Sequence, residues 1–317
     1  MHTYVITGKG KIYISGGTFA FYDAENSRTR KIPAKSADAI IITAKASITG
    51  DVFKLAARQR TTIVYAPHGK IMSTVIPATL SGNGITHIRQ VETFLNRRAE
   101  IARSIEKYGL AHAGARHTRL DIPNLDEIRE KMARAETVTE MMGIEGEFYK
   151  AYYTALDEIL PQKLQIGGRS YHPPITRGNA VVSYINALIY GHILPALAAT
   201  GLDPAVSFIH EPKHGAISLA LDVAEMYRPF LLSRTFLSAV GKYKLSPKEF
   251  EKNGIAWYLD RSGRQKVARA FSEQISRIVR VSGQRRKLAS LIRRNAYALK
   301  RAILENKSPR YLEFEVI

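Results

Sequence analysis

The segment Pro77-Ala-Thr-Leu-Ser-Gly-Asn-Gly84 divides the 317-residue chain into two kinds of sequence. Before it, apolar residues come in short runs rich in β-branched and aromatic side chains, which is typical of strands. After it, apolar residues recur at helical spacing over much longer stretches. Because chain-breaking residues at such a change are typical of a domain junction, we predict a β-domain over residues 1–78, a linker over 79–84 and an α-helical domain over 85–317.

The expected fold class is α+β and multidomain, with a small N-terminal β-sandwich followed by a mainly α-helical domain. The predicted strands contain the apolar runs at residues 4–6, 12–14, 19–21, 40–42 and 62–65. Between the last two runs, residues 49–60 show a helical pattern after a possible N-cap at Thr49, so one short helix is expected there. Beyond the linker, helices are predicted over 85–108, 125–159, 180–199 and 217–227, and in several segments after Pro247.

The charge of the chain favours a nucleic-acid partner. It has 47 Lys and Arg against 28 Asp and Glu, a formal net charge of +19, and such an excess attracts polyanions. Residues 261–301 hold thirteen of the basic residues and the single acid Glu273. The alternative is that these basic residues are only the solvated face of a buried stripe made by Phe271, Ile275, Ile278, Leu288 and Leu291. A buried stripe does not explain why nearly all the charged residues of this segment are basic. The segment can therefore both pack through the stripe and bind nucleic acid through its basic residues.

Residues 179–201 contain no charged side chain over 23 positions, which is long enough to cross a bilayer. Asn186, His192 and Pro195 would each cost free energy in lipid, so we predict a buried central helix with Asn179 as its N-cap, and no membrane contact. The N-terminus has no secretory signal pattern, which makes a cytoplasmic protein the expectation. The chain has no cysteine, so disulfides and thiolate metal sites are excluded.

Candidate chemistry lies in two separate segments. Asp222 and Glu225 are three residues apart on a predicted helix and share a face, and Pro212 and Gly215 form a turn that can bring His210 back towards them. Carboxylate and imidazole ligands suit Mg²⁺ or, better, Mn²⁺. The alternative for such a group is an ordinary surface cluster or ion pair.

The second segment surrounds Glu145, which sits among core-type residues and is followed at once by Gly146. A buried carboxylate needs a partner, so Glu145 either pairs with a basic residue such as Lys150 or binds a metal ion. No Gly-rich phosphate loop, G-x-S-x-G elbow or H-E-x-x-H pair is present, so nucleotide-binding, serine-hydrolase and zincin sites lose their main support.

These segments resemble the signature blocks of the CRISPR-associated integrase and endonuclease family Cas one. The block "M-G-I-E-G" matches Met142 to Tyr152, and "G-F-L-H … S-L-x-x-D-L-x-E-x-F-R-P" matches Ser207 to Pro229. An Asn-bearing helix that ends in "Y-G" matches residues 179–191 with Tyr190, and the pattern of the N-terminal domain fits residues 48–69. Ser207 and Lys150 stand where glycine and arginine are usual, and residues 213–216 replace a stretch that often holds arginine.

The resemblance implies a metal-dependent catalytic domain that joins 3′-hydroxyl ends of short duplex DNA into a CRISPR repeat, with related nuclease activity. Carried over by position, the metal ligands and catalytic residues are Glu145, His210 and Glu225, and Asp222 is a neighbouring carboxylate or an additional ligand of Mg²⁺ or Mn²⁺. The residues expected to bind DNA are Lys213, Arg261, Arg264, Arg285, Arg286, Arg293 and Arg294. The implied partners are DNA, a second copy in a homodimer, and the small companion protein Cas two.

Two other functions stay open at this point. A non-catalytic, basic, architectural DNA-binding protein predicts salt-sensitive DNA affinity that a chelator does not change, and no strand cleavage. A membrane-surface protein anchored through the basic helices predicts binding to anionic vesicles. Neither role needs acidic residues where they repel phosphate, so the set of Glu145, His210 and Glu225 favours the enzyme.

Overall fold

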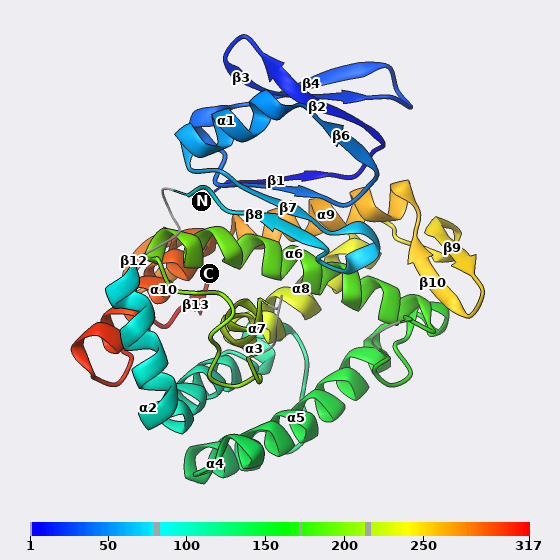
Figure 1. Ribbon diagram of the computed structural model, residues 1–317. Helices are drawn as coiled ribbons and strands as arrows, with labels where there is room; N and C mark the ends of the chain where they lie inside the picture. The colour runs from blue at the N-terminus through cyan, green and yellow to red at the C-terminus, as the bar shows by residue number, and fades with distance from the viewer. Residues whose placement is uncertain (1, 79–82, 171–172, 213–216) are drawn as a thin grey trace.

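The computed structural model describes residues 2–78, 83–170, 173–212 and 217–317. Figure 1 shows a strand-rich N-terminal part stacked on a larger, mostly helical part. The strand-rich part extends through β8 (Ser73–Val75), and the first long helix, α2, begins at Gly84. This arrangement confirms the α+β fold class with a small β-domain before a mainly helical one. Four of the six residues of the predicted linker, 79–82, lie outside the described residues.

The N-terminal part is a sandwich of two four-stranded sheets that share a small core. Parallel strands β1, β5 and β7 make one sheet, with β8 antiparallel at its edge, and the other sheet has the order β4-β3-β2-β6. Its elements are β1 (Thr3–Ile6), β2 (Gly10–Ser15), β3 (Thr18–Asp23), β4 (Arg28–Ile32), β5 (Ala39–Ile42), β6 (Ala46–Ile48), α1 (Gly50–Gln59) and β7 (Thr62–Tyr65). The short helix predicted after Thr49 is therefore α1, and Val52 and Ala56 bury its apolar face.

The helical part surrounds one large apolar core. Its helices are α2 (Gly84–Ala111), α3 (Ala115–Thr118), α4 (Leu125–Arg134), α5 (Val138–Ile159), α6 (Arg177–Thr200), α7 (Ser218–Glu225), α8 (Arg228–Gly241), α9 (Arg261–Ile275) and α10 (Leu288–Glu305). The helix predicted over 125–159 is thus two helices. Helix α4 ends with Ala135 as its C-cap. A capping box of Thr137 and Glu140 then starts α5, because their side chains accept from the free backbone N–H groups of its first turn.

Of the helical segments predicted after Pro247, α9 and α10 are present, but this region also contains strands, so the second part is less purely α-helical than expected. The hairpins β9 (Phe250–Asn253) with β10 (Ala256–Leu259) and β11 (Ile278–Val281) with β12 (Gln284–Lys287) alternate with the last two helices, and the C-terminal strand β13 (Glu315–Val316) pairs with β11. Ile278 therefore belongs to a strand rather than to a helical stripe. The β11–β12 turn is Ser282-Gly283, with φ of +48° and +77°, a backbone conformation that Gly favours and that suits a two-residue hairpin.

Helix α6 runs through the centre of the molecule (Figure 1) and carries the long uncharged stretch. It is the one helix among the described residues long and apolar enough to span a membrane, and 94% of its most apolar window is buried inside the protein. The prediction of a buried central helix is confirmed. The prediction of Asn179 as the N-cap was wrong. Thr176 caps the helix by accepting from the backbone N–H of Asn179 at 3.0 Å, while the side-chain amide of Asn179 donates to the carbonyls of Ile166 and Gly168.

The two parts meet along α6 and α9. The hydroxyl groups of Thr43 and Tyr184 are 3.1 Å apart, and Thr3 Oγ1 lies 2.7 Å from Nδ1 of His192 on α6. At the start of α9, Arg261 forms ion pairs with Asp23 of β3 and with Glu25. These contacts hold the β-domain against α6 and α9.

Candidate metal and nucleic-acid site

A cavity of about 470 Å³ opens where α5, α6, α8 and the loop before α7 meet. Glu145 of α5, His210 of the loop and Arg228 of α8 line one end of it. Glu225, the last residue of α7, does not line the cavity, but two side chains that hold it, Tyr149 and Arg228, do. The structure thus gathers the three predicted ligands around one place, although they are up to 80 residues apart in sequence.

His210 is oriented by Asp222. Its Nδ1 lies 2.8 Å from Asp222 Oδ1, and Oδ1 also accepts from the backbone N–H of His210 at 3.1 Å. The other carboxylate oxygen accepts from the N–H groups of Phe208 and Ile209. Asp222 is fully buried and accepts four hydrogen bonds in all, so it is placed to hold the imidazole with Nε2 available for a ligand.

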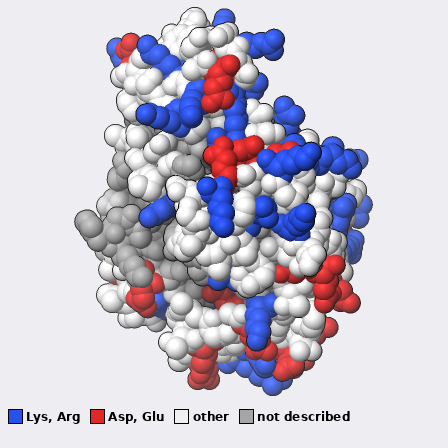
Figure 2. Space-filling model, turned by 90° about the vertical axis from the view of Figure 1, so that its right-hand side faces the viewer, with Lys and Arg blue, Asp and Glu red and all other residues white. Residues whose placement is uncertain are grey.

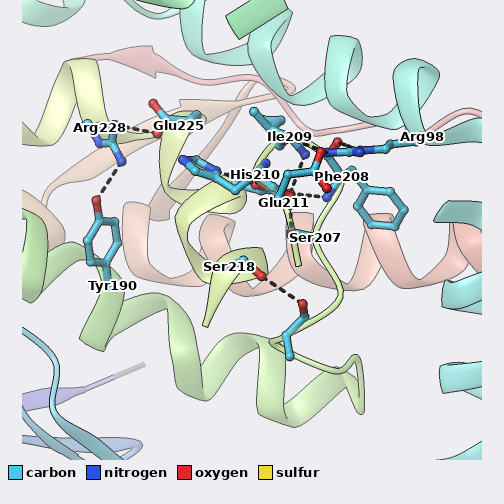
Figure 3. A network of polar contacts seen from close by, with 12 residues as sticks. Arg98, Tyr190, Ser207, Phe208, Ile209, His210, Glu211, Ser218, Glu225 and Arg228 are labelled. Carbon is cyan, nitrogen blue, oxygen red and sulfur yellow. Dashed lines mark hydrogen bonds and ion pairs between the residues drawn. The ribbon is translucent and has the colours of Figure 1, made fainter. Parts of the chain in front are cut away.

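The loop that carries His210 is fixed from two sides (Figure 3). Arg98 of α2 donates to the carbonyls of Phe208 and Ile209 and forms a 2.7 Å ion pair with Glu211. Ser207, the residue that stands where glycine is usual, donates its hydroxyl to the carbonyl of His210 at 2.6 Å. This hydrogen bond within the loop gives the serine hydroxyl a partner where glycine is usual.

Glu225 is held by a pair of buried side chains. Arg228 Nη1 lies 2.6 Å from Glu225 Oε1, and the hydroxyl of Tyr149 donates to Oε2 at 2.7 Å. Arg228 also donates to the hydroxyl of Tyr190 at 2.8 Å and lies over the rings of Tyr149 and Tyr190. Figure 3 shows the Glu225, Arg228 and Tyr190 chain beside the ring of His210. Arg228 is not among the residues singled out from the sequence, although its spacing of three residues from Glu225 is a signal for such a contact.

Burial and neighbouring charges shift the acid–base behaviour of this group. The pKa of Glu145 is raised to about 7, first by burial and then by the charge of Glu225, while Arg228 and His210 oppose the rise. Burial also works against the imidazolium of His210, but the hydrogen bond to Asp222 and the surrounding carboxylates outweigh it and raise the pKa of His210. Among the described residues Glu145 forms no ion pair, so the predicted alternative of a Glu145–Lys150 pair finds no support; Lys150 lines the cavity instead.

A fourth carboxylate, Glu106 of α2, lies close enough to interact with this group. It is only 5% exposed, and its Oε1 has no hydrogen-bond partner among the described residues. Burial, with the charges of Glu145 and Glu225, holds the pKa of Glu106 well above its usual range. Sequence reasoning missed it, although Ala102, Glu106 and Gly109 share one buried helix face and a carboxylate there is unusual.

The donor types fit a hard divalent cation, since two carboxylates and an imidazole nitrogen are ligands that Mn²⁺ and Mg²⁺ accept. Among the described residues, however, no three His, Asp or Glu side chains lie close enough together to hold one ion as they stand. The two carboxylate oxygens of Glu225 are occupied by Arg228 and Tyr149. Metal binding would therefore require Glu225 to exchange these partners.

The predicted DNA-binding residues fall into two groups. Arg285, Arg293 and Arg294 are exposed and Arg286 is half-buried, on β12 and α10. Arg261 and Arg264 instead bind protein groups, because Arg261 pairs with Asp23 and Glu25, and Arg264 donates to the carbonyls of Leu259 and Thr7. Lys213 lies outside the described residues. DNA contact by these residues stays a prediction.

The surface charge is uneven. Figure 2 shows basic side chains along the middle of one face of the molecule, with acidic side chains more frequent at its lower end. On α10, Arg293, Arg294, Lys300 and Arg301 line one open depression together with the half-exposed ring of Tyr297. Basic and aromatic side chains on one surface are suited to phosphate and base contacts.

Comparison with known proteins agrees with the fold and identifies the family. The family model described as CRISPR associated protein Cas1 matches residues 4–273. A curated relative from Thermodesulfovibrio yellowstonii, named CRISPR-associated endonuclease Cas1 3, is 29% identical over 311 residues, covering 94% of this chain and 95% of its own length.

Two solved structures share the fold. A Cas1 protein from Thermotoga maritima superposes with a TM-score of 0.84 at 22% identity, covering 96% of this chain and 97% of its own. A casposase bound to an integration product has a TM-score of 0.86 at 20% identity, with coverages of 97% and 92%. Since the family model spans most of the sequence, the chain belongs to the CRISPR-associated Cas1 family.

Proposed function

We propose that the chain is a divalent-metal-dependent DNA endonuclease and integrase of CRISPR adaptation, which joins the 3′-hydroxyl ends of short duplex DNA to a CRISPR array by transesterification. The observation that carries this proposal is that Glu145 and His210 line one cavity, with Asp222 orienting the histidine and Glu225 held by the lining residues Tyr149 and Arg228. The names of the curated relatives support the endonuclease activity, and the casposase bound to its integration product supports the joining reaction.

Glu145, His210 through Nε2, and Glu225 would hold the ion. A bound Mg²⁺ or Mn²⁺ would offset charge on the scissile phosphate and lower the pKa of the attacking hydroxyl group or water. Asp222 keeps the Nδ1 proton of His210 directed away from the cavity, and Arg228 and Lys150 supply positive charge at its wall for a phosphate oxygen. Glu145 must be deprotonated to act as a ligand, which its pKa of about 7 makes sensitive to pH near neutrality.

The exposed basic residues of β12 and α10 are proposed to bind the DNA backbone outside the cavity. A homodimer and the companion protein Cas2 are the partners that the family resemblance implies. Because the isolated chain carries a net charge of +19, its DNA affinity should fall steeply with salt, whichever partners it needs.

The test is strand transfer and cleavage of DNA with Mn²⁺ or Mg²⁺. Glu145→Gln, His210→Ala and Glu225→Gln should each lower the rate by at least about a hundredfold, the order of effect expected when one charge-stabilising group is removed. Glu147→Gln is the matched control, because Glu147 lies on α5 but faces Lys131 on the surface. Full activity in the three variants would exclude the metal site, and chelator-insensitive DNA binding without cleavage would favour the architectural protein.

A further inference from the structure

The turn between α7 and α8 carries Glu225 and Arg228, and residues that do not line the cavity hold it in place. Tyr227, between these two residues, is fully buried. Its ring meets the ring of Tyr108 of α2 edge-on, with the ring centroids 5.7 Å apart. A Cβ at Gly109, the next residue of α2, would lie 2.4 Å from the backbone oxygen of Glu225. The turn therefore lies directly against α2, and Tyr227 is part of this contact.

Asn295 of α10 adds a directed polar contact to this packing. Its side chain is 1% exposed, and its amide group donates to the hydroxyl of Tyr227 at 2.9 Å and to that of Tyr108 at 3.2 Å. The family signature "E-x-F-R-P" has phenylalanine where this chain has Tyr227. An aromatic ring alone would therefore fill the space, and the buried hydroxyl is favourable because it is paired.

The C-terminal segment, residues 306–316, fixes the orientation of Asn295. The backbone N–H of Leu312 donates to Asn295 Oδ1 at 2.8 Å, and the carbonyl of Leu312 accepts from the Asn295 amide at 3.1 Å. Further along the segment, the ring of Phe314 stacks on His112 of the end of α2, and β13 pairs with β11. With both ends of its carboxamide hydrogen-bonded to Leu312, Asn295 presents its amide group to the tyrosine hydroxyls.

Metal binding places a demand on the turn. Glu225 would have to release Arg228 and Tyr149 to bind an ion, so the contacts that hold its carboxylate in the metal-free chain would be lost. A ligand binds well only when the surrounding residues keep it close to the bound geometry. The turn then depends on contacts that do not involve the carboxylate. The hydrogen bond between Tyr227 and Asn295 is such a contact, and it joins the turn to α10.

We propose that Asn295 is a positioning residue for the metal site: through the hydroxyl of Tyr227 it holds the turn that carries Glu225, so that the carboxylate stays in place when it binds a divalent cation. This inference rests on the proposed function for the role of Glu225 as a ligand. It places a determinant of metal affinity in the C-terminal part of the chain, beyond residue 273, where the match to the family model ends.

The experiment measures Mn²⁺ affinity by electron paramagnetic resonance without DNA, at the site that Glu145→Gln abolishes, so it does not depend on catalysis. Tyr227→Phe removes only the hydroxyl and keeps the ring, so the variant should fold. It should bind Mn²⁺ about tenfold more weakly, the lower end of the loss typical when a residue that orients a ligand is changed. Tyr184→Phe is the matched control: it removes another buried hydroxyl, whose partner is Thr43 of the β-domain, and should leave the affinity unchanged.

Urea denaturation separates positioning from stability. Each of the two tyrosine variants loses one buried, paired hydroxyl, so both should lower the free energy of unfolding to a similar extent, while only Tyr227→Phe loses Mn²⁺ affinity. Unchanged affinity in Tyr227→Phe, or an equal loss of affinity in Tyr184→Phe, would overturn the proposal.

A double-mutant cycle tests whether Asn295 acts through Tyr227. Asn295→Leu should also weaken Mn²⁺ binding about tenfold, and adding Tyr227→Phe should weaken it no further, because both changes break the same contact. A loss of about a hundredfold in the double variant would mean independent effects and would refute the path through Tyr227. If Asn295→Leu does not fold, the comparison of the two tyrosine variants still decides the proposal.

A failure of the proposed function has a different signature. It would appear as a wild-type chain without any Mn²⁺ site that Glu145→Gln abolishes, which would refute the metal site and the positioning role together. A normal site in the wild type, with unchanged affinity in Tyr227→Phe, would refute the positioning role alone.

Discussion

Replacement of Asp222 by Asn tests the central argument about the site most directly. The carboxylate accepts four hydrogen bonds, from three backbone N–H groups and from His210 Nδ1, and it is fully buried. An asparagine keeps the shape but turns one acceptor oxygen into an NH₂ group. Two of the four donors would then face a donor, and the loop that carries His210 would lose the group that fixes it.

The magnitude follows from these contacts. Hydrogen bonds to a charged group contribute about 1.5–3 kcal/mol each, so losing two of them should lower the free energy of unfolding by roughly 3–6 kcal/mol. That is a large part of the 5–15 kcal/mol typical of a folded domain. Loss of a carboxylate that orients a metal-binding histidine typically weakens metal affinity by about 10- to 100-fold. Both effects should appear together, because one side chain performs both roles.

Urea denaturation gives the stability, and titration with Mn²⁺ followed by electron paramagnetic resonance gives the affinity at a temperature where the variant is folded. Asp121→Asn is the control, since Asp121 is exposed and the substitution makes the same change in net charge. An Asp222→Asn variant as stable as the wild type would refute the energetic argument. Unchanged Mn²⁺ affinity in a folded variant would refute the role of Asp222 in orienting His210.

Further predictions concern packing, pH and DNA. Gly109→Ala would bring a Cβ within 2.4 Å of the backbone oxygen of Glu225, so it should lower the free energy of unfolding by about 1–3 kcal/mol in urea denaturation. The control Gly143→Ala, whose Cβ would meet nothing within 4 Å, should raise that free energy by about 0.5–1 kcal/mol. Equal effects of the two substitutions would contradict the close approach of α2 to α7. The raised pKa of Glu145, about 7, means that the folded chain favours its protonated form. The stability of the metal-free chain should therefore fall as pH rises from about 4.5 through 7, while the affinity for Mn²⁺ rises. Glu145→Gln should flatten this change in stability, which calorimetry at pH 5, 6, 7 and 8 measures. Arg294→Ala should weaken DNA binding equally for all sequences and reduce the salt slope by about 1, whereas Arg261→Ala should mainly lower the melting temperature because it breaks the pairs with the β-domain; the reverse pattern in anisotropy and melting would exchange their roles.

The pattern of the sequence was sufficient for the two-part architecture. The short β-branched runs before residue 78 can bury one face only by pairing in sheets. The long uncharged stretch of α6 can bury its apolar side chains only if other elements surround the helix. The break between α4 and α5 was missed because apolar periodicity continues through it, although Thr137 and Glu140 form a recognisable capping box. The late hairpins were missed because their strands are only four residues long, too short to show a clear alternation, and β12 contains no apolar residue.

The site divides in the same way. Glu145, His210 and Glu225 could be chosen from motifs whose residue types and spacing are visible in one dimension. The role of Asp222 could not be predicted from the sequence, because an aspartate three residues from Glu225 is equally a possible metal ligand. Only the structure shows that its oxygens accept from the backbone N–H groups of residues 208–210. Likewise, Arg261 and Arg264 are indistinguishable from DNA-binding residues until the β-domain is seen to lie against them.

The sequence by itself determined the fold class, the basic character and the set of chemically competent residues, because hydrophobic period, net charge and ligand type are properties of the residues themselves. Only the tertiary structure decided which of these groups share an environment. It brought Glu106 of α2 beside the carboxylates of α5 and α7, placed Arg228 against Glu225, and joined Tyr227 to Asn295 of α10. Burial and proximity between distant segments set pKa values and hydrogen-bond partners, and neither is defined until the chain has folded.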